Sequence, residues 1–148
     1  MDKSGIVRIL ETTLDERMQH AKKAMDAAQQ SANEQGKSSV GDKYETARSM
    51  GQLDRDMFAR QYESARQERL ILERINPQEV HKQVTLGSVV DTTAGWFFVA
   101  VSFGKLAYLQ ESVMVVSSLS PIGRALLGKS AGDSFDFMGK KQQINAVE

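Results

Sequence analysis

The sequence predicts an α+β protein, in which a long N-terminal antiparallel coiled-coil hairpin precedes a small antiparallel β domain with one short helix. Three observations lead to this class. Apolar residues recur at steps of three and four over residues 6–32 and again over residues 44–75. A short segment rich in glycine and serine separates these two patterns. After Pro77 the spacing changes to the alternation that is typical of strands.

These patterns divide the chain into three segments. We expect the hairpin over residues 1–76, with its tip at about 36–45, a linker over 77–83 and the β domain over 84–148. A domain of about 65 residues has a marginal hydrophobic core. We therefore expect the β domain to pack against the base of the hairpin.

The first helix is predicted from residue 6 to about residue 35, where Gly36 is a plausible end signal. Its apolar stripe consists of Ile6, Leu10, Leu14, Met18, Ala21, Met25, Ala28 and Ala32. No proline interrupts it. About 30 helical residues span roughly 45 Å, which is long for a globular helix and favours a coiled coil.

The second helix is predicted to follow a turn at residues 37–41 and to end at about Ile75, before Pro77. Its apolar positions, expected in the core, are Tyr44, Ala47, Met50, Leu53, Met57, Phe58, Tyr62, Ala65, Leu72 and Ile75. Two helices of similar length joined by a short turn form an antiparallel hairpin.

The rest of the chain is predicted to form about five antiparallel strands and one short helix. Strand-like patterns occur in six segments, 84–90, 96–103, 106–109, 113–116, 134–138 and 142–147, from which we expect a sheet of about five strands. The helix is expected over residues 120–128, because Ser120 is a good N-cap, Pro121 suits the first helical position and Gly128 suits the end. Leu126 and Leu127 are expected in the core.

Composition excludes several classes of protein. Lysine plus arginine and aspartate plus glutamate number 19 each, so the zero net charge argues against a general nucleic-acid or membrane-surface binder. The absence of cysteine excludes disulfides and thiolate metal sites. The N-terminal residues do not resemble a signal peptide, and the most apolar segment, 96–109, is too short to span a bilayer. We expect a cytoplasmic protein without membrane contact.

Asp42 and Glu45 are the candidate functional residues at the hairpin tip. They lie three residues apart, so in a helix they fall on nearly one face. Two carboxylates on a thin rod could reach a narrow site and share a Mg²⁺ ion there as oxygen ligands. The same spacing is also typical of a capping box, in which both side chains accept bonds from the first helical N–H groups. Both interpretations remain open at this point.

No motif for catalysis within the chain is present. There is no glycine-rich phosphate loop and no Gly-x-Ser-x-Gly motif. The two histidines, His20 and His81, lack a partner at metal-binding spacing and are expected at the surface. The protein is therefore expected to be an accessory factor that acts through another enzyme.

Two segments resemble the bacterial Gre transcript-cleavage factors. Residues 120–129 read Ser-Pro-Ile-Gly-Arg-Ala-Leu-Leu-Gly-Lys and are followed by Gly132-Asp133, which is similar to the family's Ser-Pro-x-x-Arg-x-Leu-x-Gly-Lys signature. At the tip, Gly41-Asp42-x-x-Glu45-x-Ala47 is similar to the family's Gly-Asp-x-x-Glu-Asn-Ala pattern. The predicted architecture resembles that of the family over the whole chain.

The resemblance implies a partner and a site. It implies that an FKBP-like C-terminal domain docks on RNA polymerase through Ser120, Pro121 and Arg124, and that the hairpin enters the secondary channel. Asp42 and Glu45 would then help to hold Mg²⁺ of the polymerase active site, where the 3′ end of backtracked RNA is hydrolysed. The protein would have no cofactor of its own and would be a monomer.

The chain also departs from the family pattern. Thr46 replaces the family's asparagine, Arg48 replaces an acidic residue, the turn over 36–41 is longer, and Leu119 replaces the asparagine or aspartate that commonly precedes the Ser-Pro. These departures leave open a second function, that of a non-cleaving regulator of the polymerase secondary channel. A third possibility, a prolyl isomerase, is disfavoured because so small a domain leaves little room for a deep aromatic pocket.

Overall fold

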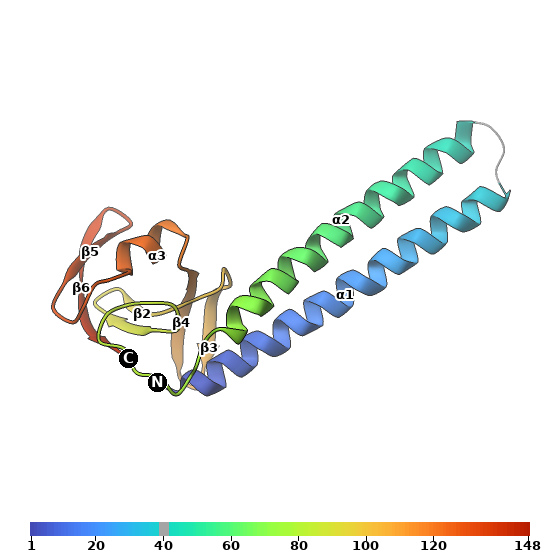
Figure 1. Cartoon of the computed structure of the whole chain (residues 1–148). Helices are drawn as coiled ribbons and strands as arrows, with labels where there is room; N and C mark the ends of the chain where they lie inside the picture. Colours follow the sequence, from blue (N-terminus) through green and yellow to red (C-terminus); the bar gives the residue numbers. More distant parts are fainter. Residues whose placement is uncertain (39–41) are drawn as a thin grey trace. The chain divides into compact units, whose positions relative to one another are not determined.

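The computed structural model describes residues 1–38 and 42–148, and within these it describes side chains for residues 1–34 and 45–148. The described chain has the predicted α+β fold, with three helices and one six-stranded sheet (Figure 1). The elements are α1 (Lys3–Ser38), α2 (Asp42–Glu73), β1 (Val89–Thr92), β2 (Gly95–Ala100), β3 (Gly104–Tyr108), β4 (Glu111–Ser117), α3 (Pro121–Leu126), β5 (Ser134–Phe137) and β6 (Lys140–Val147).

The chain forms two compact units, and their boundary crosses both long helices. One unit contains Met1–Leu10 and Leu70–Glu148, and the other contains Glu11–Arg69. The first turns of α1 and the last turn of α2 therefore belong to the same unit as the sheet. The rest of the two helices forms the second unit, which is called the hairpin unit below.

Helix α1 is longer than predicted at both ends. It begins at Lys3 and continues to Ser38, so the prediction that Gly36 ends the helix is wrong. The predicted turn at 37–41 overlaps the last residues of α1, and the remainder of this prediction lies outside the described residues. A single glycine inside a helix costs only about 1 kcal/mol relative to alanine. The backbone hydrogen bonds of the helical residues on both sides of it can offset this cost.

Within the hairpin unit, α1 and α2 are antiparallel and approach each other closely at one level. A Cβ atom added to Gly51 of α2 would lie only 2.8 Å from the Cβ of Ala32 of α1. Nearer the other end of the unit, the Arg69 guanidinium contacts two carboxylates one helical turn apart on α1. Its Nε lies 3.0 Å from Asp15 Oδ1 and its Nη2 lies 3.8 Å from Glu11 Oε2.

The apolar stripe of α2 is only partly buried, which corrects the prediction that all of it belongs to the core. Ala65 and Leu72 are buried, but Met50 and Leu53 are 61% and 67% exposed, and Met57 is also exposed. The predicted stripe is wider than the face of α2 that a single neighbouring helix can cover. Side chains at the edge of the stripe therefore remain in contact with solvent.

In the unit that contains the sheet, the start of α1 packs against β3. Gly5 provides the space for this contact, because a Cβ at this position would overlap the hydroxyl of Tyr108. The Lys3 ammonium is buried and donates a 2.8 Å hydrogen bond to the carbonyl oxygen of Glu79, in the linker. Burial lowers the pKa of Lys3.

The sheet has the order β3-β4-β2-β1-β6-β5, and two of its features differ from the prediction. It contains six strands where about five were predicted, and β2 and β4 pair in parallel, with Trp96 opposite Val113. β4 is inserted between β2 and β3, which follow each other in the sequence. β4 carries the apolar residues of a central strand, whereas β3 exposes Lys105 and suits an edge.

The core of the sheet lies between its strands and α3. It contains Val84, Val90, Phe97, Val99, Val116, Leu126, Phe135 and Ile144. The Phe97 ring meets Phe135 and Phe137 edge-on, with ring centroids 6.2 Å and 5.5 Å apart. Leu126 is buried as predicted, but Leu127, which follows the last residue of α3, is exposed, so the prediction that it lies in the core is wrong.

Candidate functional site

The predicted tip residues lie at the start of α2. The helix begins at Asp42, so Asp42 and Glu45 both belong to its first turn, three residues apart. The side chain of Glu45 is exposed, whereas the side chain of Asp42 lies outside the described residues. Thr46 and Arg48, two of the departures from the family pattern, are exposed in the same part of α2.

The first turn of a helix favours carboxylates for two separate reasons. Its free N–H groups and the positive end of the helix dipole both attract negative charge, so capping alone accounts for acidic residues there. Carboxylate oxygens are also the ligands that Mg²⁺ prefers. Two carboxylates from one helical turn supply only part of the octahedral shell that Mg²⁺ requires.

A complete metal site is not found in the part of the chain with described side chains. There, no group of three or more histidine, cysteine, aspartate or glutamate side chains is placed to hold a metal ion. Likewise, no helix among the described residues is long and apolar enough to cross a membrane.

The predicted docking residues lie around α3, and the predicted N-cap is confirmed. The Ser120 hydroxyl accepts a hydrogen bond of 3.1 Å from the Gly123 N–H and donates one of 2.7 Å to the carbonyl oxygen of Ser117. Pro121 is the first helical residue, and Arg124 is exposed in the last turn. This end of α3 lies tightly against the end of β4, because a Cβ on Gly123 would overlap the Ser117 carbonyl oxygen.

The second half of the signature has a structural role that the sequence did not show. The Lys129 ammonium donates a 2.9 Å hydrogen bond to the carbonyl oxygen of Ser134, and the Asp133 carboxylate accepts one of 2.8 Å from the Ser130 N–H. Gly132 has a φ of 92°, which favours glycine. These residues close the connection between α3 and β5.

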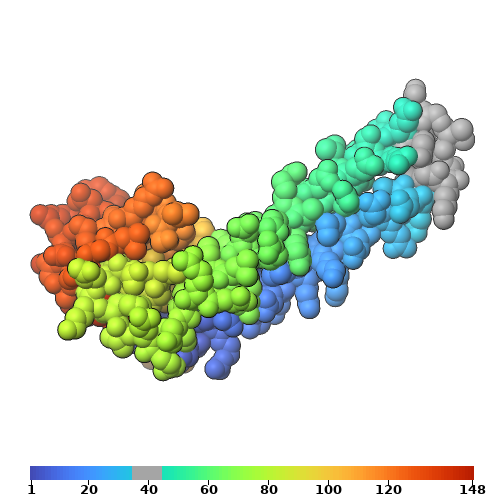
Figure 2. All heavy atoms as spheres, viewed as in Figure 1, coloured from blue at the N-terminus to red at the C-terminus, as the bar shows by residue number. Residues whose placement is uncertain are grey.

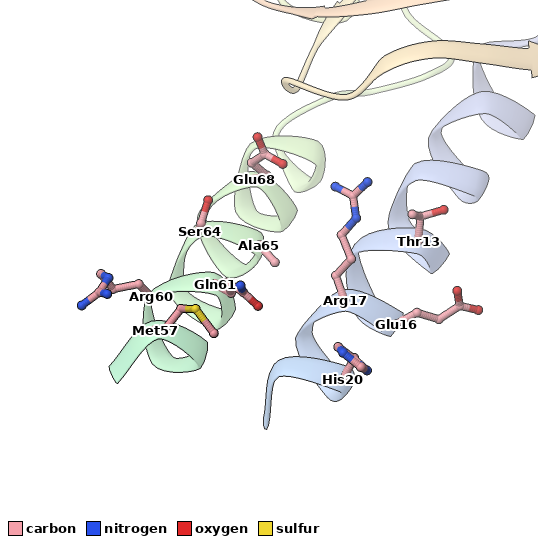
Figure 3. A pocket seen from close by; sticks show the side chains of 10 residues that line it. All are labelled: Thr13, Glu16, Arg17, His20, Met57, Arg60, Gln61, Ser64, Ala65 and Glu68. Carbon is pink, nitrogen blue, oxygen red and sulfur yellow. The ribbon is translucent and has the colours of Figure 1, made fainter. Parts of the chain in front are cut away.

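A groove along the hairpin unit was not predicted. It has a volume of about 640 Å³ and lies between α1 and α2 (Figure 3). It is lined by Thr13, Glu16, Arg17, His20, Met57, Arg60, Gln61, Ser64, Ala65 and Glu68. Figure 2 shows the atoms of this unit as spheres, with α1 in blue and α2 in teal to green.

The two histidines differ in environment. His20 is exposed at the groove, as predicted for a surface residue. The His81 side chain is only 13% exposed, with its Nε2 3.8 Å from Glu79 Oε1, so the prediction of a surface position is wrong for this residue. The linker folds back against the sheet, and the ring of His81 lies near Gly87.

Among known proteins, similarity to this chain is found in solved structures. The chain matches no family model and no curated protein sequence. Four chains of known structure match it. One is described as "Structure of the transcription factor Gfh1"; it is 20% identical, with a TM-score of 0.37, and the match covers 92% of this chain and 90% of that chain.

Proposed function

We propose that this chain is an accessory factor of RNA polymerase that stimulates cleavage of backtracked RNA. In this proposal the β domain binds the polymerase and the hairpin tip enters the secondary channel. The observation that carries the proposal is the position of the helix start: α2 begins at Asp42, so the predicted carboxylate pair lies in the first turn at one end of an antiparallel hairpin. The signature segment around α3 supplies the docking residues Ser120, Pro121 and Arg124.

The dimensions of the hairpin unit support entry into a channel. The part of α1 beyond Leu10 has a length of roughly 40 Å, and two helices side by side are about 20 Å wide. A rod of this width can enter an opening that excludes a globular domain. In addition, helical residues hold side chains on a fixed backbone, which limits the entropy lost when they bind.

The proposed role of the two carboxylates is to complete a metal site in another protein. Asp42 and Glu45 would supply oxygen ligands to Mg²⁺ in the polymerase active site and orient a water molecule beside it. A bound Mg²⁺ lowers the pKa of water and stabilises charge that develops on phosphate oxygens. This chain alone is expected to bind Mg²⁺ weakly, because two carboxylates make up a small part of the required octahedron.

The alternative is a regulator that occupies the channel without stimulating cleavage. The observation in its favour is that Thr46 and Arg48 are exposed close to Glu45. A guanidinium beside the carboxylates would reduce the net negative charge of this part of the helix. The carboxylates would then attract a cation more weakly. Prolyl isomerase activity has no such support, because the aromatic rings of Phe97, Phe135 and Phe137 pack against each other in the core.

The test is cleavage of RNA in a stalled, backtracked elongation complex at several Mg²⁺ concentrations. Wild-type protein is compared with Asp42→Asn, which removes the charge but preserves capping, since asparagine caps a helix about as well as aspartate. A matched control is Asp26→Asn, which makes the same change at an exposed position of α1. We expect Asp42→Asn to abolish cleavage with an unchanged melting temperature, and Asp26→Asn to have no effect.

Other outcomes would distinguish the alternatives. If Asp42→Asn cleaves as well as wild type, the carboxylate only caps the helix, and Asp42→Ala should then lower stability by about 0.5–2 kcal/mol. If wild-type protein inhibits nucleotide addition without stimulating cleavage, the non-cleaving regulator is the correct function.

A further inference from the structure

A small cavity lies where residues of three strands meet the residues that precede α1. It has a volume of about 250 Å³ and is lined by Met1, Asp2, Trp96, Tyr108, Leu109 and Glu111. All of these residues belong to the compact unit that contains the sheet. The volume is below the range of about 300–1,000 Å³ that is usual for pockets of drug-sized ligands, so the cavity suits a single side chain.

The pairing of three adjacent strands brings two aromatic rings and a carboxylate to the same face of the sheet. Tyr108 of β3 lies opposite Glu111 of β4, and Trp96 of β2 lies opposite Val113 of β4. Because alternate residues of a strand share a face, Glu111 and Val113 lie on the same side of β4. Trp96 is therefore a diagonal neighbour of Glu111, at a separation that an aromatic side chain can span.

Asp2 supplies a second carboxylate, which is held in place by one of the rings. Its Oδ2 accepts a 2.9 Å hydrogen bond from the Tyr108 hydroxyl. The carboxylate of Glu111 is exposed and forms no ion pair with any residue whose side chain the structure describes. The Met1 ammonium also lines the cavity, but it pairs with Glu148 Oε2 at 3.0 Å. The charge of Glu111 is therefore available to a cation from outside the chain.

Carboxylates and aromatic faces in one cavity indicate a cationic ligand. The faces of tryptophan and tyrosine rings attract cations, and carboxylates pair with them. An arginine side chain uses both features, because its planar guanidinium can stack on a ring while its N–H groups donate to a carboxylate. After the larger effect of the Tyr108 hydrogen bond, the charge of Arg8 helps to lower the pKa of Asp2, but Arg8 does not line the cavity. The same negative charges would repel the phosphates of a nucleic acid.

We propose that this cavity binds an arginine side chain of a partner protein, with the guanidinium stacked on Trp96 and donating to Glu111. Leu109 favours a partner protein over free arginine. It is 85% exposed at the turn between β3 and β4 and offers apolar surface beside the cavity to whatever carries the arginine. Free arginine would instead bring its own carboxylate toward those of Asp2 and Glu111, which would repel it. The proposal does not depend on the proposed function, because it defines the partner by a side chain.

The experiment uses the fluorescence of Trp96, which is the only tryptophan in the sequence and so reports on the cavity directly. The purified full-length chain is titrated with the tripeptide Gly-Arg-Gly, blocked at both ends. A second titration uses the same peptide with citrulline, an uncharged isostere of arginine. We expect the arginine peptide to change the fluorescence saturably in the millimolar range. The citrulline peptide should bind about fivefold more weakly or not at all, because it lacks the charge.

Two variants test the role of the carboxylate. Glu111→Gln removes the charge but keeps the shape of the side chain, and it should weaken binding of the arginine peptide by about threefold to tenfold. The matched control is Asp136→Asn, which neutralises an exposed carboxylate of the same unit on β5 and should leave the affinity unchanged. Circular dichroism and melting temperature verify that both variants are folded.

Several results would overturn the proposal. Fluorescence that does not saturate with the arginine peptide, or equal affinity of wild type and Glu111→Gln, would refute the site. Binding of the peptide Gly-Lys-Gly as tight as that of Gly-Arg-Gly would refute the choice of arginine, since a lysine ammonium cannot stack on a ring in the same way. Tighter binding of free arginine than of the blocked peptide would refute a partner protein as its source.

Discussion

At the start of α1, the carboxylate of Asp2 accepts a hydrogen bond of 2.9 Å from the Tyr108 hydroxyl. This bond is the main reason why the pKa of Asp2 is lowered from 3.8 and that of Tyr108 is raised from 10.0. The Asp2 shift stabilises the fold above pH 3.8, and this contribution is lost as the pH falls through the lowered pKa. On the alkaline side, the contribution is present below pH 10.0 and is lost as the pH rises through the raised pKa of Tyr108.

We predict that Tyr108→Phe returns the pKa of Asp2 toward its ordinary value. The phenyl ring can still pack beside Gly5, so the change mainly removes the hydroxyl donor. NMR titration of the Asp2 carboxyl carbon in wild type and in the variant measures the pKa directly. An Asp2 pKa that is the same in both proteins would show that the hydrogen bond does not form in solution.

At the scale of the element, the contact of α1 with α2 depends on the absence of a side chain at Gly51. Alanine stabilises an isolated helix by about 1 kcal/mol relative to glycine. Here an added Cβ would lie 2.8 Å from the Ala32 Cβ, with backbone atoms of α1 close behind it. Forcing extra volume into a packed site costs about 1–3 kcal/mol, so packing should outweigh the gain in helix propensity.

We therefore predict that Gly51→Ala lowers the free energy of unfolding, and that adding Ala32→Gly recovers part of the loss. The double variant restores space at the contact, so the two changes should be strongly non-additive in a double-mutant cycle. Urea unfolding followed by circular dichroism measures all four proteins. A Gly51→Ala variant that is more stable than wild type would mean that the helices do not approach so closely.

At the scale of the whole molecule, the division into two compact units predicts that a substitution in one unit destabilises mainly that unit. Phe97 is buried in the core of the sheet, and its loss should cost about 3–5 kcal/mol in the unit that contains it. We predict that Phe97→Ala increases amide hydrogen exchange in β1, β2 and β6 and changes exchange within the hairpin unit much less. Equal loss of protection in the strands and in the part of α1 that follows Leu10 would show that the two units unfold together.

Elements with a strong local signal were predicted correctly from the sequence. The three-and-four spacing of residues such as Leu10 and Leu14 predicted α1, and the Ser-Pro pair at 120–121 predicted the start of α3. The α+β class follows from the change of pattern after Pro77. These features depend on residues close together in the chain, whose backbone preferences act before any long-range contact forms. The start of a helix near Asp42 belongs to the same group.

Only the tertiary structure decided which surfaces are covered. Contacts between segments far apart in the sequence decide the position of β4 between β2 and β3 and the exposure of Met50 and Leu53. They also decide the partial burial of His81. Side-chain spacing specifies the apolar face of an element, but burial depends on whether another element reaches that face.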